Sequence, residues 1–495
     1  MKTLKINPSD NVVVALSELK AGESVTVGDL TITVTENIAP GHKLAIKNIG
    51  AGEAVTKYGH KIGNATADIS AGQTVHTHNL KTALDGLLEY TYNPKKAEKK
   101  SATPTTFKGF KRKDGKVGIR NEVWIIPTVG CINSTALQLE KDASKLLGAD
   151  STIDGIYSFG HPYGCSQLGD DHENTRRAIA GLISHPNAGA VLVVGLGCEN
   201  NDAESLKKLL GDYDTDRVKF LICQECKNEF EDGLVLMREL IDYANGFERE
   251  DVQMSELIVG LKCGGSDGFS GITANPLAGA FADRLIAEGG AIILTEVPEM
   301  FGAETILMDR CQTSEIFENT VKMINDFKNY YIKNGQNIYE NPSPGNKAGG
   351  ITTLEDKSLG CVQKGGSTNV VDVLGYCEPV KTRGLNLLTG PGNDLVSVSA
   401  MTASGAHLIL FTTGLGTPFG APAPTVKISS NTALYDKKKR WIDFDAGRLL
   451  KDTKMETLRD ELYEYVRSLA SGEIKAKNEI LGAREFTIFK TGITL

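Results

Sequence analysis

The stretch "LIVGLKCGGSDGFSGITANP", Leu257 to Pro276, joins an apolar strand, a glycine-rich loop and the start of a helix. Its apolar run has the length and composition of a strand that is covered on both faces. Lys262 and Cys263 end this run, and the loop that follows contains Ser266 and Asp267. Ligands of open α/β sheets bind beyond the carboxyl ends of the strands. The stretch therefore predicts one segment of an active-site rim on a parallel sheet.

Short apolar runs alternate with amphipathic stretches along the chain after about residue 117. Runs that are apolar on both faces and alternate with helices indicate a parallel sheet covered on two sides. The expected fold class is therefore α/β. The eight candidate strands are "EVWIIPTVG", "GIYSFG", "AVLVVGLG", "VKFLIC", "ELIVGLK", "AIILTEVP", "LNLLTG" and "HLILFTTG".

Side chains that can bind metals or transfer protons follow six of these strands. Besides the residues 262–267 already named, they are Cys131, His161, Cys165, Cys198, Glu199, Gln224–Cys226, Glu296 and Glu299. We expect His161, Cys165 and Glu296 to share one cleft with the 262–267 loop, because the carboxyl ends of parallel strands meet at one edge. Ordinary packing is the competing interpretation for the thiols, since cysteine is among the most buried residue types.

Residue composition and hydrophobic patterning divide the chain into four parts. Residues 1–92 alternate in strand fashion between glycine turns and predict a small all-β domain. Residues 93–116 are rich in lysine and poor in aliphatic side chains, which predicts a linker. Residues 117–250 then predict a second α/β domain, and residues 251–495 a C-terminal catalytic domain.

Composition narrows the class of partner. The net charge of −8 and the aromatic content of 6% argue against a nucleic-acid surface, so small molecules are the expected partners. No run of eighteen apolar residues and no signal-peptide pattern occurs, so we expect no membrane partner and a cytoplasmic protein. Nine scattered cysteines do not form a disulfide framework, and we expect free thiols.

Three motifs admit a simpler interpretation. The glycines of "GLGTPFG", residues 414–420, are followed by prolines that exclude the helix of a dinucleotide site. "CQEC", residues 223–226, has no second pair for structural zinc. His76 and His78 in "VHTHN" would share one face of a strand and suit a divalent metal, or lie exposed at the strand's end.

Several long motifs resemble the altronate and galactarate dehydratase family. They are "GFKRKDGKVGIRNEVWIIPTVGCIN", "HPYGCSQLGDDHENTRRAIAGLISHPNAGAVLVVGLGCENN", "KCGGSDGFSGITANPLAG", "TEVPEMFGAE" and "FTTGLGTPFG". The N-terminal "GHKLAIKNI" and "YGHKIGNATADISAGQTVHTHN" are similar to the SAF-type β-clip domain of the same family. The resemblance covers essentially the whole chain.

The resemblance implies a sugar-acid hydro-lyase that needs ferrous iron. It implies an N-terminal β-clip domain, a second domain that can carry a homodimer contact, and a Rossmann-like C-terminal catalytic domain. The chain length and the "YGCSQLGDDHENT" loop favour the altronate branch, so the expected reaction converts D-altronate to 2-dehydro-3-deoxy-D-gluconate. Galactarate or a related sugar acid is the alternative substrate.

This reaction removes the proton at C2 and the hydroxyl at C3, so it needs a base and an acid. We assign one proton transfer to His161, which can titrate near neutrality, and the other to Asp267 or Lys262. Arg120 and Asn121 are candidate binding residues for the sugar acid, because a guanidinium binds a carboxylate through two hydrogen bonds. A structural ion pair is an equally good interpretation of Arg120. Ser266 is a further candidate substrate contact.

Two arrangements of a catalytic metal and one non-enzymatic function remain open. In the first, Fe(II) or another divalent cation binds imidazoles and carboxylates drawn from His76, His78, Glu296 and Glu299. The second places an iron-sulfur cluster on Cys165, Cys198 and Cys263, because thiolates favour such clusters. The third is a sugar-acid binding or sensing protein without turnover.

The N-terminal domain is expected to act as part of a lid. A tether of roughly 20 residues is long enough to let the edge that carries His76 and His78 reach the carboxyl end of the sheet. We predict that this histidine pair faces the catalytic domain and contributes to the metal or substrate site.

Overall fold

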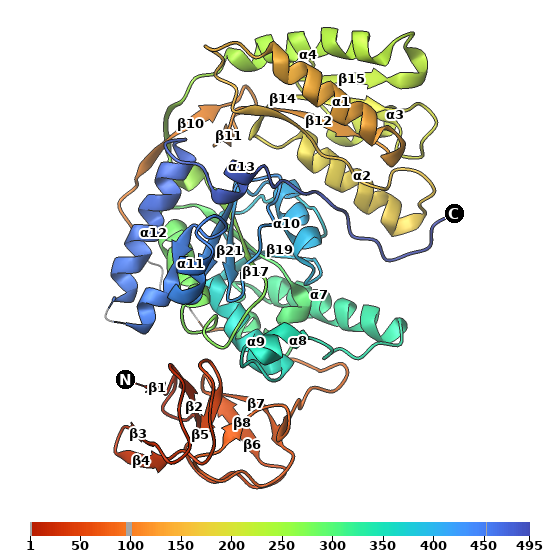
Figure 1. The fold of residues 1–495 in the computed structure, drawn as a ribbon. Helices are drawn as coiled ribbons and strands as arrows, with labels where there is room; N and C mark the ends of the chain where they lie inside the picture. The colour runs from red at the N-terminus through yellow and green to blue at the C-terminus, as the bar shows by residue number, and fades with distance from the viewer. Residues whose placement is uncertain (1, 96–100, 452) are drawn as a thin grey trace.

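The computed structural model describes residues 2–95, 101–451 and 453–495. It contains three stacked parts: a small β domain at one end, a seven-stranded parallel sheet in the middle, and a four-stranded parallel sheet at the other end (Figure 1). This arrangement confirms the α/β fold class with a small N-terminal strand-rich domain.

The N-terminal domain consists of short antiparallel strands joined by glycine turns. Strands β1, β2, β5 and β8 form one sheet, and β6, β7 and β9 another. Tyr58 and Gly59 turn the β6–β7 hairpin with φ values of 60° and 77°, a left-handed conformation that is unusual for tyrosine. The strands are β1 (Thr3–Leu4), β2 (Val12–Ala15), β3 (Ser24–Val27), β4 (Leu30–Thr33), β5 (Lys43–Ala45), β6 (Ala54–Lys57), β7 (His60–Ala65), β8 (Thr74–Val75) and β9 (Leu80–Lys81).

The second domain is a four-stranded parallel sheet in the order β13-β12-β14-β15. Helices α1 and α4 cover one face, and α2 and α3 cover the other, because every residue of the central strand β14 is buried on both sides. The elements are β12 (Glu122–Pro127), α1 (Asn133–Ala143), β13 (Gly155–Ser158), α2 (Gly169–Ile183), β14 (Ala188–Gly195), α3 (Ala203–Leu210), β15 (Val218–Ile222) and α4 (Glu229–Asn245).

The C-terminal domain holds a seven-stranded parallel sheet in the order β19-β20-β18-β17-β21-β22-β23. Helices α5 and α12 pack on one face, and α10 lies on the other, between the sheet and α2 of the second domain. The strands are β17 (Ile258–Cys263), β18 (Ala291–Leu294), β19 (Val370–Leu374), β20 (Gly384–Leu388), β21 (Leu408–Thr413), β22 (Thr425–Ser429) and β23 (Phe444–Asp445). The helices are α5 (Ala274–Ala287), α6 (Glu304–Met308), α7 (Ser314–Lys333), α8 (Pro344–Ala348), α9 (Leu354–Cys361), α10 (Asp394–Ala403), α11 (Thr432–Lys437), α12 (Met455–Ala470) and α13 (Lys477–Leu481).

All eight strands expected from the sequence are present and run parallel to their neighbours, but they belong to two sheets. The first four are β12 to β15 of the second domain, and the other four are β17, β18, β20 and β21 of the C-terminal domain. The strand ends therefore form two separate rims, and the expectation of a single rim is wrong.

A three-stranded neck joins these two domains. Strand β10 (Thr106–Lys111) pairs with β11 (Val117–Gly118) and with β16 (Glu250–Gln253). Strand β10 falls within the interval expected to be a linker, yet Phe107 and Phe110 are buried there. The lysines of this segment, Lys108 and Lys111, point to solvent and pair with acidic residues of β16, so a lysine-rich composition conceals a strand.

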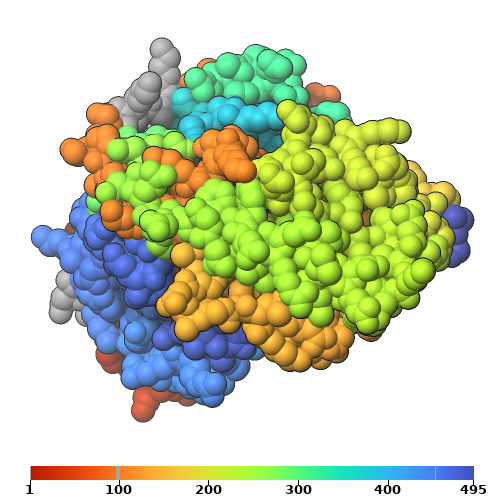
Figure 2. Space-filling view, turned by 90° about the horizontal axis from the view of Figure 1, so that it is seen from above, coloured from red at the N-terminus to blue at the C-terminus, as the bar shows by residue number. Residues whose placement is uncertain are grey.

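The chain after α13 runs back across the second domain. The backbone amide of Thr491 donates to Oδ1 of Asp171 at 2.7 Å, and that of Leu495 donates to the carbonyl of Ser166 at 3.0 Å. Figure 2 shows the face formed by the second domain, with the dark blue C-terminal end at its edge. Among the residues that the structure describes, no helix has both the length and the apolar character needed to cross a bilayer.

Candidate active site

A charged helix lies fully buried between the N-terminal domain and the central sheet. All eight residues of α9 are buried, although Glu355, Asp356, Lys357 and Ser358 are polar. The Thr353 side chain caps the helix by accepting from the amide of Asp356. Polar groups are retained at such depth only when they are paired, so the partners of α9 define the site.

The N-terminal domain supplies the partners of Asp356. Nζ of Lys43 lies 2.8 Å from Oδ2 of Asp356, and Nζ of Lys57 lies 3.0 Å from Oδ1. Burial opposes ionisation of Asp356, yet the two ammonium groups hold its pKa well below the usual range. Two cations share one carboxylate, so this triad carries an excess positive charge, and burial lowers the pKa of Lys43 to about 8.

Two histidines of the N-terminal domain face the same region. Nδ1 of His76 lies 3.0 Å from Oγ1 of Thr352, just before α9, and Nε2 of His42 lies 3.2 Å from the carbonyl of Ala348. The two rings have centroids 4.9 Å apart. Burial lowers the pKa of His42 and brings that of His76 to about 4, so both imidazoles are neutral at pH 7.

His78, by contrast, is exposed. His76 and His78 lie in the turn between β8 and β9, and they do not share the face of a strand as expected. The side chain that pairs with His76 is His42, 34 positions earlier in the chain. Only the tertiary fold of the domain brings these two rings together.

The carboxyl ends of β17 and β18 meet in a nest of buried ion pairs. Lys262 donates to Oε1 of Glu296 and lies 2.9 Å from Oδ1 of Asp394. Lys364 donates to Oε2 of Glu296 at 3.0 Å and to Sγ of Cys263 at 2.8 Å. Burial alone would lower the pKa of Lys262, but the Glu296 carboxylate outweighs burial and holds it above the usual range.

Glu299 extends this nest towards α9. Its Oε1 atom lies 2.9 Å from Nζ of Lys357, and its Oε2 atom lies 3.2 Å from Sγ of Cys263 and 3.1 Å from Sγ of Cys361. The two sulfur atoms are 3.4 Å apart. Burial disfavours the Glu299 carboxylate, but Lys357 holds its pKa well below the usual range, whereas the contact with Cys263 raises that of the Cys361 thiol.

A small cavity lies between this nest and the N-terminal domain. Its walls include Lys57, Tyr58, Ser266, Lys357 and Cys361. The Ser266 hydroxyl is buried and has no hydrogen-bond partner among the described residues. A buried hydroxyl without a partner is costly, and a bound polar ligand would satisfy it.

Asp267 also lines this cavity, but its carboxylate is committed to the loop. Its Oδ1 atom accepts from the amides of Phe269 and Ser270 and from the hydroxyls of Ser270 and Ser430. The arrangement fixes the turn that presents Ser266. Lys262, Glu296 and Glu299 thus lie in the nest of ion pairs, and Ser266 and Asp267 line the cavity beside it.

Three candidates from the sequence lie elsewhere. His161 belongs to the second domain, where Nε2 donates to the carbonyl of Pro127 at 2.9 Å and Nδ1 accepts from the amide of Tyr163 at 3.2 Å. Burial lowers its pKa to about 4. Arg120 forms a buried two-point ion pair with Glu479, at 2.8 and 2.9 Å. The amide of Asn121 is used by backbone and side-chain partners in the second domain. These contacts support packing roles for all three.

Sequence reasoning missed most of the lysines in this site. Lys43, Lys57, Lys357 and Lys364 have the local appearance of surface residues, and charged side chains are rarely buried unless paired. Each of them finds its carboxylate far away in the chain, as with Lys43 and Asp356, which are 313 residues apart. The only local indication was "KYGHK", a turn with a tyrosine where glycine or asparagine is usual.

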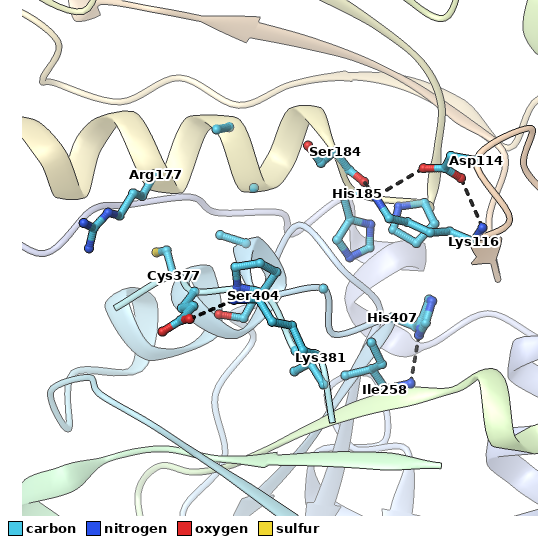
Figure 3. Close-up of a pocket in the computed structure, with 18 of the residues that line it drawn as sticks. Asp114, Lys116, Arg177, Ser184, His185, Ile258, Cys377, Lys381, Ser404 and His407 are labelled. Atoms are coloured by element: carbon cyan, nitrogen blue, oxygen red, sulfur yellow. Dashed lines mark hydrogen bonds and ion pairs between the residues drawn. The ribbon is translucent and has the colours of Figure 1, made fainter. Parts of the chain in front are cut away.

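A larger cavity lies away from these groups. It has a volume of about 800 Å³ and lies between α2 of the second domain and the loops at the amino ends of β17 and β21 (Figure 3). His185 and His407 line it, and the ring nitrogens of both are hydrogen-bonded within the protein. Its charged side chains are of both signs, and Arg383 and Lys381 are paired with Glu256 and Glu378. The cavity therefore shows no concentration of catalytic groups.

Three family profiles match successive parts of the sequence. The "Altronate/galactarate dehydratase SAF domain" matches residues 1–83, the "D-galactarate dehydratase/Altronate hydrolase, second domain" matches 109–245, and the "D-galactarate/Altronate dehydratase, C-terminal" matches 254–494. The altronate dehydratase of Bacillus subtilis (strain 168) is 51% identical over 494 residues, which is 99% of both chains. The chain belongs to the altronate/galactarate dehydratase family.

Further similar proteins include a second altronate dehydratase and two proteins named for other substrates. The altronate dehydratase of Escherichia coli (strain K12) is 51% identical over 496 residues, 100% of both chains. The galactarate dehydratase (L-threo-forming) of the same organism is 30% identical over 510 residues, 97% of this chain and 94% of the relative. The β subunit of (2R)-sulfolactate sulfo-lyase from Chromohalobacter salexigens is 31% identical over 396 residues, 77% of this chain and 97% of the relative.

The iron that this family resemblance implies does not fit the nest. Cys263, Glu299 and Cys361 are the one group of three potential ligands within 4.8 Å of one another in the described parts of the chain. Lys364 and Lys357 already donate to two of them, and three lysines balance the carboxylates of Glu296, Glu299 and Asp394. A divalent cation would add charge to a buried site that is already balanced.

The imidazoles of His42 and His76 fit iron better. Each ring uses one nitrogen in a hydrogen bond and leaves the other without a partner among the described residues. Both rings are neutral at pH 7, the state that binds metals. A site between these rings would lie at the edge of the N-terminal domain that contacts Thr352 and α9.

Proposed function

We propose that this protein is a cytoplasmic hydro-lyase that converts D-altronate to 2-dehydro-3-deoxy-D-gluconate. The observation that carries the proposal is the 51% identity to two altronate dehydratases over essentially the full length of all three chains. Identity to the galactarate dehydratase is 30%, which makes galactarate the weaker choice. The buried site between the N-terminal domain and α9 gives this activity a location.

The region beside α9 is the proposed substrate site; its closed cavity has a volume of about 10 Å³, room for about one water molecule, so the sugar acid would enter only when the N-terminal domain moves away. Lys57 and Lys357 line this cavity with ammonium groups that attract the carboxylate of a sugar acid. The unpartnered hydroxyl of Ser266 is free to bond a sugar hydroxyl. Lys262 and Asp267 act in this proposal by positioning, since Lys262 holds Glu296 behind the cavity and Asp267 holds the loop of Ser266.

The Lys43–Asp356–Lys57 triad is the proposed acceptor of the C2 proton. Asp356 and Lys57 line the cavity, but Asp356 raises the pKa of Lys57, so the amine that loses its proton at about pH 8 is that of Lys43, behind Asp356, and the C2 proton would pass to it through the Asp356 carboxylate. A neutral amine in a buried site is a general base of suitable strength for a proton next to a carboxylate. A rate that rises with pH, is half-maximal at about pH 8 and levels off above that pH is the expected signature.

Tyr58 is the proposed donor to the departing C3 hydroxyl. Its side chain lines the cavity, and burial raises its pKa, so the phenol keeps its proton at neutral pH. Its backbone φ of 60° is a conformation that costs free energy for a residue with a side chain and that clusters at functional sites. Tyr58→Phe should reduce kcat by about 100-fold or more and leave the KM for altronate within a few-fold.

Fe(II), or another divalent cation in its place, is the proposed cofactor, with His42 and His76 as its ligands from this chain. Bound there, it would stabilise the negative charge that develops on the carboxylate side of the substrate. The N-terminal domain would act as a lid that excludes water. A homodimer through the second domain is also proposed, and light scattering of the purified protein tests it.

The test of the activity is an anaerobic assay with ferrous iron and a panel of aldonates and aldarates. D-altronate should be turned over with a kcat/KM at least 100-fold above that for galactarate. A preference for galactarate would overturn the substrate, and no turnover of any sugar acid would overturn the enzyme. His42→Ala and His76→Ala should each remove about one iron per chain and most of the turnover, whereas the exposed His78→Ala should retain both.

A further inference from the structure

The second domain carries a free thiol after every strand of its parallel sheet. Cys131 follows β12, Cys165 follows β13, Cys198 follows β14, and Cys223 and Cys226 follow β15. The carboxyl ends of parallel strands lie at one edge of a sheet, so these thiols gather on the same edge. This edge belongs to a different sheet from the proposed active site.

Three of the thiol-bearing loops are bonded to one another. The amide of Gly130 donates to the carbonyl of Tyr163 at 2.8 Å, and that of Asn201 donates to the carbonyl of Gly164 at 3.0 Å. Gly164 has a φ of 101°, and a Cβ there would lie 2.0 Å from the carbonyl oxygen of Thr128. Glycine thus lets the loops of Cys131 and Cys165 touch, and Asn201 ties the loop of Cys198 to them.

Cys131, Cys165 and Cys198 are exposed, contrary to the tendency of cysteine to be buried. Their contacts are weak: the Ser166 hydroxyl lies 3.9 Å from Sγ of Cys165, and Nε2 of Gln224 lies 3.6 Å from Sγ of Cys198. Cys223 and Cys226 differ, because both pack against the apolar core and burial raises their pKa. The sheet edge therefore separates three accessible thiols from two packed ones.

Polar groups without partners accompany the three accessible thiols. Nε2 of Gln167 and Oδ1 of Asn201 are buried and unpartnered within the described chain. Helices α1 and α2 begin close after Cys131 and Cys165, and no side chain caps their first amides. Uncapped helix N-termini favour negative charge, and an unpartnered amide N–H can donate to it. Gln167 thus offers an anionic group a donor, whereas Oδ1 of Asn201 can only accept, and Asp170 and Asp171 already place negative charge in the first turn of α2.

We propose that Cys131, Cys165 and Cys198 bind an iron-sulfur cluster through three thiolates. Thiolates favour iron-sulfur clusters and zinc among the metals of proteins, and each thiol loses its proton on binding. A single tetrahedral ion needs its ligands close together, and these three sulfurs do not form a group within 4.8 Å. A cluster is several ångströms across and spans ligands that are farther apart.

Three protein ligands leave one corner of the cluster without a thiolate. Cys223 and Cys226 do not complete the set, because the Cys226 thiol donates to the carbonyl of Ile222 and Cys223 is packed beside Leu196. Cys263, a member of the alternative cluster set drawn from the sequence, is left out of this proposal because it is buried in the other sheet against Lys364. The proposal goes beyond the dehydratase activity and does not depend on the residues placed in its site.

The test is chemical analysis of the full-length protein, purified without oxygen and reconstituted with iron and inorganic sulfide. The wild type should become brown and contain equal amounts of protein-bound iron and acid-labile sulfide beyond any iron held by histidine. Cys131→Ser, Cys165→Ser and Cys198→Ser should each reduce the sulfide content and the visible absorption at least fivefold. The matched control Cys226→Ser should retain both, and circular dichroism should show that all four variants are folded.

Three results would overturn the proposal. They are stoichiometric zinc without sulfide, a loss in Cys226→Ser as large as in the other variants, and full sulfide content in the triple serine variant. The outcome is separate from that of the proposed function. His42→Ala and His76→Ala should leave the sulfide content and the visible absorption unchanged even if they abolish turnover.

Discussion

Nζ of Lys43 lies 2.8 Å from Oδ2 of Asp356, with both side chains wholly buried, although 313 residues separate them in the sequence. Asp356 binds Lys57 through its other oxygen, so this carboxylate holds two ammonium groups of the N-terminal domain on α9, beside Glu355, which accepts from Thr82 and Ala83. Removing the Asp356 carboxylate would leave two buried ammonium groups without a counter-ion. Asp356 therefore supplies the buried charge pairing in the docking of the N-terminal domain, alongside the hydrogen bonds of His42 and His76.

Asp356→Asn is predicted to lower the free energy of unfolding by about 3–5 kcal/mol, because uncompensated buried charges are costly. Urea unfolding measures this change. The control is Asp251→Asn, which removes an ion pair of the same 2.8 Å length between exposed side chains, Lys108 and Asp251. That control should change stability by less than about 1 kcal/mol. Equal effects in the two variants would contradict the assigned importance of the triad.

Acid is predicted to destabilise the protein between pH 6.5 and 4. Burial lowers the pKa of His161 and His407 to about 4 and that of His185 to about 3, against 6.5 when unfolded. The unfolded chain therefore binds more protons in this range, and the stability present at pH 7 is lost as the pH falls. Unfolding measured at a series of pH values should show this slope, and His185→Gln should reduce it by about one proton. A stability that is flat from pH 7 to 5 would refute the prediction.

Ser266→Ala is predicted to raise the KM for altronate by about 10-fold, the cost of one hydrogen bond to the substrate. Stability should not fall, because the hydroxyl has no partner in the described structure. Ser358→Ala is the matched control, since that hydroxyl is also buried and unpartnered but lies outside the cavity wall. Steady-state kinetics of the two variants test this prediction. Equal KM values for Ser266→Ala and Ser358→Ala would show that Ser266 does not contact the substrate.

Arg120→Met is predicted to destabilise the protein by about 3 kcal/mol, because Glu479 loses its two-point partner and keeps only Arg484, at 3.6 Å. The KM for altronate should remain within twofold when it is measured at a temperature where the variant is folded. Glu479→Gln, which removes the other half of the pair, should show the same pattern. A raised KM with unchanged stability would instead indicate that Arg120 binds the substrate.

The strands could be predicted because their signal is local. A buried strand such as β14 can be recognised by its eight consecutive apolar or small residues. Its alternation with helices along the chain indicates parallel pairing. The division into two sheets is not local. It depends on the neck formed by β10 and β16, whose lysines resemble those of a linker. The sheet assignment, and with it the expectation of one rim, therefore failed.

The site was predictable to the extent that it lies on strand ends. Lys262 and Glu296 follow two adjacent strands, so pattern alone placed them together. His161 failed for a physical reason: a histidine at a strand end can equally bridge two backbone groups, and here it does. Lys43 and His42 were missed because their partners lie in another domain. No periodicity within one segment can reveal such a contact.

The chain enters the second domain through β10 and leaves it through β16, and these strands pair antiparallel, with Thr106 opposite Gln253 and Gly109 opposite Glu250. The two crossing points are thus as close as the arms of a hairpin, about 5 Å apart. Domains with neighbouring ends can be inserted or removed without stretching their host. A short turn from Lys111 to Glu250 could bridge the gap. The second domain is in this way inserted at one point of the chain, yet excising it would break the buried Arg120–Glu479 pair and expose the apolar core that α2 shares with α10, so the insertion has become part of the core of its host.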